Sequence, residues 1–348
     1  MGLGADFRSD TLTQPTAAMR AAMAAATVGD DVFGEDPTVQ ALEREAAQAL
    51  GMEQALFVPS GTMANQIAVH VHCRSGDELI CEERSHVFVY EGGGAARLSG
   101  TQVRTCATRD GFPTPEQVAG LIRVDNDHYP RSRLLVLENT HNMAGGRVLR
   151  PDRQEALVAV ARQHGLAVHV DGARLANAAV ALQLPLPALT RGIDSVSLCF
   201  SKGLGAPVGS VIAGTAAFVK AARRARKAFG GGMRQAGILA AAARIALSEG
   251  MALLARDHAR AQRLARAFAA LDGLVVAPET VETNIVIVEV PGRAPDDLVT
   301  YLASRGVRAL VVGPGRVRFV LHRDLDDAGV ELCVHEVATW TRNPKRTP

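Results

Sequence analysis

The sequence predicts an α/β fold, with a large layered domain around a parallel or mixed sheet and a smaller α+β domain after it. Up to about residue 271, short continuous apolar runs alternate with segments rich in Ala, Glu and Leu. Continuous apolar runs are typical of strands that helices cover on both faces of a sheet. Beyond residue 271 the pattern changes to three apolar runs and two helical segments. A chain of 348 residues is long enough for both domains.

The expected elements alternate regularly along the chain. Two helical segments come first, at 15–26 and 38–50, with a polar loop at 29–37 between them. The expected strands of the large domain are 55–58, 77–81, 102–107, 134–138, 166–170, 196–200 and 209–213, and the helices among them are 62–73, 115–123 and 151–164. The smaller domain is expected to contain strands 284–290, 307–312 and 317–321 and helices 295–305 and 325–341. We place the boundary inside a long helical stretch, which gives domains of residues 1–250, with the N-terminal segment, and 251–348.

Composition excludes several classes of protein. The formal net charge is +2, so neither nucleic acid nor an acidic membrane surface is an expected partner. The basic run at 220–227 is interpreted as a solvated helix face. No apolar run is long enough to span a bilayer, and the N-terminus does not have the pattern of a signal peptide. The five cysteines form no CxxC pair, and we interpret them as reduced thiols in a cytoplasmic protein.

A lysine and an aspartate that follow two buried strands carry the strongest chemical signal. Lys202 comes after the apolar run 195–200 and before glycines, and Asp171 ends the run 166–170. Burial disfavours the charged ammonium form, and a neutral amine can form a Schiff base with a carbonyl. Pyridoxal phosphate (PLP) requires such a lysine for its aldehyde, and an acid that keeps its pyridine nitrogen protonated. The pair therefore predicts a PLP site.

A phosphate site is predicted at the loop Ser60-Gly61-Thr62, just before an expected helix. Free backbone N–H groups and the helix dipole at such a position favour an anion, although the same residues are also ordinary N-capping residues. The sequence contains no P-loop. The glycines between 203 and 209 have the wrong spacing for a dinucleotide site, and Pro207 falls where the helix would run.

Eight motifs in order along the chain resemble those of the L-threonine aldolases, in the fold-type I (aspartate aminotransferase-like) group of PLP enzymes. The motifs lie at 7–13, 28–37, 57–62, 85–86, 137–142, 169–174, 201–204 and 230–235. The resemblance covers nearly the whole chain. It implies a three-layer large domain with a mixed, mostly parallel sheet and a small C-terminal α+β domain. It also implies a homo-oligomer, either a dimer or a tetramer built from dimers, with active sites at subunit interfaces.

The resemblance implies a set of cofactor contacts. The implied cofactor-binding residues are Ser60, Gly61, Thr62, His86, Asp171, Arg174, Lys202, Lys227 and Arg234. Lys202 would bind the aldehyde, Asp171 would pair with the pyridine nitrogen, and His86 would stack on the ring. Lys227 and Arg234 would reach the phosphate of a neighbouring subunit.

It also implies catalytic and substrate-binding residues. The implied catalytic residues are Lys202, His86, His128 and Asp171, and the implied substrate-binding residues are Ser9, Phe33, His128, Arg174 and Arg318. An arginine fork that holds the substrate carboxylate would select which Cα bond breaks. The base for the β-hydroxyl proton is left open among His86, His128 and a bound water. The family usually has Tyr where this chain has Phe33, which leaves substrate preference open. No cluster of metal ligands is expected.

The implied activity is reversible cleavage of L-threonine and L-allo-threonine to glycine and acetaldehyde. The alternatives on the same scaffold are an aldolase for bulkier β-hydroxy amino acids, such as phenylserine, and a β-eliminating lyase. A cofactor-free binding protein is a third hypothesis, which intact Lys202 and Asp171 disfavour.

Overall fold

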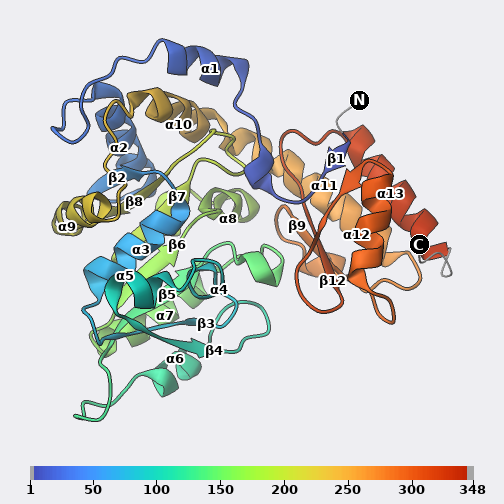
Figure 1. Cartoon of the computed structure of the whole chain (residues 1–348). Coiled ribbons are helices and arrows are strands. Elements are labelled where there is room, and N and C mark those ends of the chain that lie inside the picture. The colour runs from blue at the N-terminus through green and yellow to red at the C-terminus, as the bar shows by residue number, and fades with distance from the viewer. Residues whose placement is uncertain (1–3, 343–348) are drawn as a thin grey trace.

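The computed structural model describes residues 4–342 and shows two parts joined by a long helix (Figure 1). The large part is built on a seven-stranded sheet with the order β2-β8-β7-β6-β5-β3-β4. These strands are β2 (Gln54–Val58), β3 (Glu78–Glu82), β4 (Gln102–Cys106), β5 (Ser132–Glu138), β6 (Ala167–Asp171), β7 (Ser195–Cys199) and β8 (Ser210–Gly214). β8 runs antiparallel to both of its neighbours, and the other pairs are parallel, so the sheet is mixed and mostly parallel.

Helices cover both faces of this sheet, which makes the large part a three-layer structure. Alternate residues of β2 show the division, because Ala55 and Phe57 pack in one apolar cluster while Leu56 and Val58 pack in another. The first cluster includes residues of α1 (Ala17–Ala24), α2 (Pro37–Leu50), α7 (Pro151–Gln163), α8 (Leu175–Leu182) and α10 (Gly237–Glu249). The opposite face carries α3 (Gly61–His72), α5 (Gly94–Ser99) and α9 (Ala216–Ala228). The remaining helices of this part are the short α4 (His86–Val89) and α6 (Pro115–Leu121). The fold expected from the sequence is confirmed.

The smaller part contains a three-stranded antiparallel sheet, in the order β11-β12-β9. Its strands are β9 (Ile285–Glu289), β11 (Leu310–Val311) and β12 (Arg316–Val320), and its helices are α12 (Pro295–Ser304) and α13 (Asp327–Arg342). α11 (Met251–Ala269) joins the two parts, because it packs on α8 at one side and on α13 and β9 at the other. α10 and α11 meet at a bend of 64° next to Gly250, where the predicted domain boundary falls.

The start of the N-terminal segment, before α1, does not lie where we expected it. We placed it with the large domain, but β1 (Ala5–Asp6) pairs in parallel with β10 (Val307–Arg308) of the smaller part. Phe7 is fully buried in the core of that part, with its ring 6.0 Å from the ring of Phe319. The short apolar stretch around Phe7 has no periodicity that shows which core it enters, so only the tertiary structure places it.

Among residues 4–342, no single helix is long and apolar enough to cross a membrane, and only the bent pair α10 and α11 passes that test together. All five cysteines are free thiols.

Candidate active site

A cavity of about 290 Å³ lies between the two parts of the molecule. Its lining comes from six segments that are far apart in the sequence and includes Ser9, Thr11, His86, Tyr90, Asn142, Arg174, Lys202, Leu310, Val311, Val312 and Arg318. The large part contributes the carboxyl ends of its strands, which is where ligands bind in open α/β sheets. Five residues predicted for the site, Ser9, His86, Arg174, Lys202 and Arg318, line this one cavity.

Asp171 and Lys202 lie at the inner end of the site because β6 and β7 are neighbours in the sheet. Asp171 is the last residue of β6 and is almost fully buried. Its Oδ2 accepts a hydrogen bond from Asn65 Nδ2 at 2.7 Å, and its Oδ1 accepts one from the Ala173 N–H at 3.0 Å. Burial alone would raise the pKa of Asp171, but the positive charges of His86 and Lys202 lower it. The side chain is therefore a carboxylate that can pair with a cationic ring nitrogen.

The predicted phosphate loop lies at the same edge of the sheet. Ser60 caps α3, and its Oγ accepts a hydrogen bond from the Met63 N–H at 3.2 Å. A Cβ atom on Gly61 would lie 2.7 Å from Cys199 Sγ, so only glycine lets the start of α3 approach the end of β7 this closely. Asn65, one turn further along α3, contacts Asp171. The N-terminus of α3 is thus adjacent to Asp171 and Lys202, where a phosphate on the same cofactor would lie.

His86 begins α4 and is held from two sides. Its backbone N–H donates to Glu138 Oε2 at 2.7 Å, and its Nδ1 lies 2.8 Å from Glu91 Oε1. Burial would lower the pKa of His86, but the hydrogen bond with Glu91 and the charges of Asp171 and Glu91 raise it overall. With Nδ1 engaged by Glu91, Nε2 is the ring nitrogen available to a ligand in the cavity.

Arg174 and Asp10 form a buried ion pair at the floor of the cavity. Arg174 Nε donates to Asp10 Oδ2 at 2.8 Å, and Nη2 donates to Oδ1 at 2.7 Å, which is a two-point fork. Burial would raise the pKa of Asp10, but Arg174 and Lys202 lower it to about 2. Sequence reasoning assigned Arg174 to ligands and missed Asp10, although Asp10 lies inside the N-terminal motif 7–13.

Arg318 reaches the cavity from β12 of the smaller part. Its Nη1 donates to Asn142 Oδ1 at 2.8 Å and its Nη2 donates to the Arg8 carbonyl at 3.2 Å, and both acceptors are neutral. Its Nε has no hydrogen-bond partner, and within residues 4–342 no carboxylate lies within ion-pair distance of it. Burial and the nearby Arg174 lower the pKa of Arg318. A ligand carboxylate would supply the missing negative charge.

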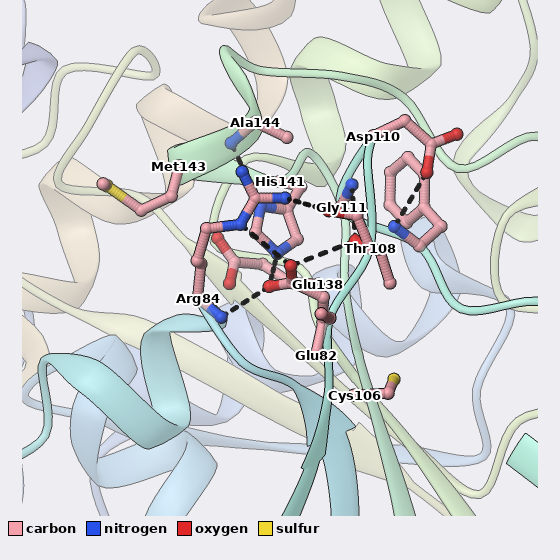
Figure 2. Close-up of polar contacts among 12 residues, drawn as sticks. Glu82, Arg84, Cys106, Thr108, Asp110, Gly111, Glu138, His141, Met143 and Ala144 are labelled. Atoms are coloured by element: carbon pink, nitrogen blue, oxygen red, sulfur yellow. Dashed lines mark hydrogen bonds and ion pairs between the residues drawn. The ribbon is translucent and has the colours of Figure 1, made fainter. Parts of the chain in front are cut away.

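Glu82, Glu138 and His141 belong to a buried polar cluster (Figure 2), which also holds the loop that carries Asn142. Glu138, at the end of β5, accepts from the Asn142 N–H at 2.8 Å as well as from the His86 N–H. His141 Nε2 lies 3.1 Å from Glu82 Oε2, and His141 Nδ1 accepts from the Ala144 N–H at 3.2 Å. Because Nδ1 accepts, Nε2 carries the proton and donates to Glu82. This cluster holds His86 and Asn142 in a fixed relation, and sequence reasoning did not find it.

Three other residues that were predicted for the site lie away from this cavity. Phe33 is 75% exposed, and Arg234 Nη1 lies 3.0 Å from Asp30 Oδ2. Lys227 lines a separate basic cavity with Asp31, Val32, Lys220, Arg223, Arg224, Arg226 and Gly232. Within one chain these residues do not line the cavity that contains Lys202.

His128 also lies away from the cavity. It is exposed, in the loop before β5, and its backbone N–H donates to Asn126 Oδ1 at 2.9 Å. The site lies at the other end of β5, near Glu138, and six residue steps of about 3.3 Å separate the two ends by roughly 20 Å. A role for His128 at the substrate therefore stays a prediction that needs a second chain.

The residues present fit PLP. A lysine amine and a buried carboxylate lie at adjacent strand ends, and a helix N-terminus with a glycine approach lies beside them. His86, Glu91 and Asp171 also offer atoms that lie within 4.8 Å of one another, the spacing of a possible cation site. Amide and imidazole groups already bond these atoms to one another and to Asn65, so the network is satisfied without an ion.

Comparison with known proteins decides the family. The family model described as beta-eliminating lyase matches residues 6–291. Low-specificity L-threonine aldolase 1 of Arabidopsis thaliana is 42% identical to this chain, over 98% of each chain. The chain belongs to the beta-eliminating lyase family, and within it to the L-threonine aldolases. Low specificity L-threonine aldolase of Escherichia coli K12 is 43% identical, over 95% of this chain and 97% of the relative.

Solved structures show the same fold. A threonine aldolase from Leishmania major matches with a TM-score of 0.85 at 20% identity, covering 97% of this chain and 99% of that one. A structure of SPT with PLP matches with a TM-score of 0.77 at 18% identity, covering 97% and 87%. The family to which the chain belongs consists of PLP-dependent lyases.

Proposed function

We propose that this protein is a PLP-dependent L-threonine aldolase, which cleaves L-threonine and L-allo-threonine to glycine and acetaldehyde. The family membership supports this proposal, because low-specificity aldolases match the chain over almost its full length. The observation that carries it in the structure is the meeting of Lys202, His86 and Arg318 in one cavity. These three side chains supply an amine for the cofactor, a base and a carboxylate-binding cation.

When bound, PLP accepts the electron pair that is released as the Cα–Cβ bond breaks. In the proposed arrangement, Lys202 holds the cofactor and Asp171 keeps the proton on its ring nitrogen. Asp171 can do so because its carboxylate remains charged while fully buried. Loss of Asp171 would leave the ring nitrogen without a counterion in a low-dielectric site.

Arg318 binds and orients the substrate carboxylate. Of the two arginines of the cavity, it is the one without an anionic partner within residues 4–342, whereas Arg174 is already bonded to Asp10. A carboxylate held at Arg318 fixes the rotation about the bond to Cα and so determines which Cα bond is aligned for cleavage. We expect Arg174, at the floor of the cavity, to contribute positive electrostatic potential, because Asp10 already occupies the pair of donors that forms its fork.

His86 takes the β-hydroxyl proton at Nε2. Of the two histidines predicted for this role, it is the one that lines the cavity within one chain. The base must be neutral before it accepts a proton. Because the pKa of His86 is raised, activity should increase as the pH rises through that pKa.

The oligomer and the location remain part of the proposal. Lys227 and Arg234 are cations outside the cavity of their own chain, which supports the prediction that they serve a neighbour's phosphate in a homodimer or dimer of dimers. Five free thiols support a cytoplasmic location.

The test is acetaldehyde release by the PLP-loaded protein from L-threonine and L-allo-threonine, with D-threonine as the control. Release from the L-isomers alone supports the proposal, and the ratio of the two rates gives the selectivity at the β-carbon. Ammonia and a keto acid in place of acetaldehyde would instead identify a β-eliminating lyase.

A further inference from the structure

Glu91 is a buried carboxylate beside His86 to which the proposed mechanism gives no role. It lies between α4 and α5, and its side chain is fully buried. Three nitrogen atoms surround it. His86 Nδ1 lies 2.8 Å from Oε1, Asn65 Nδ2 donates to the same oxygen at 2.7 Å, and Gln66 Nε2 donates to Oε2 at 2.6 Å. Such a fully bonded carboxylate can hold a fixed position next to the cavity.

Asn65 connects Glu91 to Asp171. Its Nδ2 donates to both carboxylates at 2.7 Å, so both hydrogens of the amide group are used. Its Oδ1 must then be the acceptor that faces His169, whose Nε2 lies 3.1 Å away. A single neutral side chain therefore separates the carboxylate beside His86 from the carboxylate that faces the cofactor.

The orientation of the Asn65 amide is fixed by His169, which bonds its Oδ1. Burial lowers the pKa of His169 to about 3, so its ring is neutral and carries one N–H. That N–H is at Nε2, because Asn65 Oδ1 can only accept, and Nδ1 then accepts from Ser195 Oγ at 2.9 Å. Ser195 Oγ in turn accepts from His72 Nε2 at 2.8 Å. Each hydrogen bond in this series, from His72 through Ser195 and His169 to Asn65, is donated in the direction of the two carboxylates. The Asn65 amide therefore has one stable orientation.

We propose that Glu91 is the positioning residue of His86: it holds the Nδ1 side of the imidazole so that Nε2 faces the cavity, and Asn65 ties this pair to Asp171. The inference rests on the proposed function of His86 as the base. Without Glu91, the ring could rotate and present either nitrogen, and Nε2 would face the substrate for only part of the time.

Several charged or titratable groups face His86, and each has a definite effect. Glu91 and Asp171 favour its protonated form, whereas Lys202 opposes it. Glu138 binds its backbone N–H from β5, and the Tyr90 ring lies 5.6 Å from the imidazole ring. Asn65 and Gln66 on α3 are neutral. Removal of the Glu91 charge should therefore lower the pKa of His86, by about one unit for the loss of an adjacent opposite charge.

The test uses Glu91→Gln and a measurement that does not require catalysis. In cofactor-free protein with ¹³C-labelled histidine, NMR titration reports the pKa of His86, whose signal is identified by its loss in His86→Gln. We expect the pKa to fall by about one unit in E91Q. In the PLP-loaded enzyme, the acidic limb of the kcat profile should move down in pH by a similar amount, kcat should fall and KM should change little.

Glu78→Gln is the matched control. Glu78 is also a fully buried glutamate, and it lies near Arg123 and Arg104. It is the first residue of β3, so it lies at the end of the strand that is away from the cavity. The Glu78→Gln substitution should lower the free energy of unfolding without changing the pKa of His86. An unchanged His86 pKa in E91Q, or an equal shift in E78Q, would overturn the inference.

Glu91→Asp keeps the test decisive if E91Q does not fold. It retains the charge but withdraws the carboxylate by one methylene, so the pKa of His86 should fall by less than in E91Q while kcat still drops. An unaltered kcat and pKa in E91D would contradict the positioning role. Failure of this inference is separable from failure of the proposed function, because absence of acetaldehyde release by the unmodified enzyme would reject the function whatever the titration shows.

Discussion

Arg174 and Arg318 are two buried arginines of one cavity that differ in their partners. Arg174 comes from the large part and is forked onto the Asp10 carboxylate, whereas Arg318 comes from the smaller part and bonds only to neutral oxygens. Both were predicted from the sequence to bind ligand. The difference shows that residue type and burial do not alone decide the role of a cation, because Asp10 already takes two of the donor atoms of Arg174. Arg318 can still bind a ligand carboxylate.

The largest expected effect is on stability, from Asp10→Asn. The change leaves the Arg174 charge buried without its partner, which typically lowers the free energy of unfolding by about 3–5 kcal/mol. Urea denaturation at pH 7 measures it. Asp6→Asn is the control, because Asp6 pairs with the more exposed Arg8 and should cost about 1 kcal/mol or less. A D10N protein as stable as the wild type would remove the contrast between the two arginines.

Arg318→Leu should act on binding and not on stability. Loss of a charged hydrogen bond to the substrate carboxylate, of about 3 kcal/mol, predicts a fall in kcat/KM for L-threonine of roughly 100-fold, mainly through KM. It should also raise the proportion of transamination side products, since the carboxylate orients Cα. Steady-state kinetics with product analysis measures both. Arg316→Leu, on the same strand but outside the cavity lining, is the control. An R318L enzyme with an unaltered product ratio would show that another group orients the substrate.

The acid stability of the protein should depend on the Asp10 pair. Since the folded-state pKa of Asp10 is about 2 against an ordinary value of 3.8, ionisation of Asp10 adds roughly 2 kcal/mol to the stability, and this part is fully present above about pH 5. That contribution is lost as the pH falls through 2. The difference in unfolding free energy between wild type and D10N should therefore shrink between pH 5 and pH 2. A difference that stays constant over this range would mean that Asp10 does not titrate as the ion pair requires.

Asn142→Ala should have the smallest of these effects. It removes one neutral hydrogen bond that orients Arg318, worth about 1 kcal/mol, so KM should rise roughly fivefold while kcat changes little. Kinetic measurements in both N142A and R318L test whether the residues act together. Because Asn142 is expected to act through Arg318, N142A should have no further effect in an R318L background. Additive effects would place Asn142 in direct contact with the substrate.

The sequence predicted the fold and the inner site because these depend on local signals. Lys202 and Asp171 follow apolar strand runs, and the carboxyl ends of adjacent parallel strands must meet. Ser9, His86 and Arg318 were placed by motif resemblance, and the structure brings all three to the cavity.

The partners of these residues could not be predicted in the same way. Asp10 pairs with a residue 164 positions away, and Asn65 contacts Asp171 across 106 positions, so no local pattern reveals either contact. Glu91, five residues after His86, was near enough to notice but has no spacing rule that marks it. Phe33, His128, Lys227 and Arg234 lie outside the cavity of one chain, so a single chain cannot show the predicted shared site.

The location of Lys202 is the claim on which the account depends, and the chain allows a clean test because it has only four lysines. Borohydride reduction of the PLP-loaded protein, followed by digestion and mass spectrometry, identifies the lysine that carries the cofactor. The account predicts a pyridoxyl group on the peptide that contains Lys202 and none in a Lys202→Ala variant. A modification on Lys220 or Lys227 instead, or the same labelling in the variant, would contradict it.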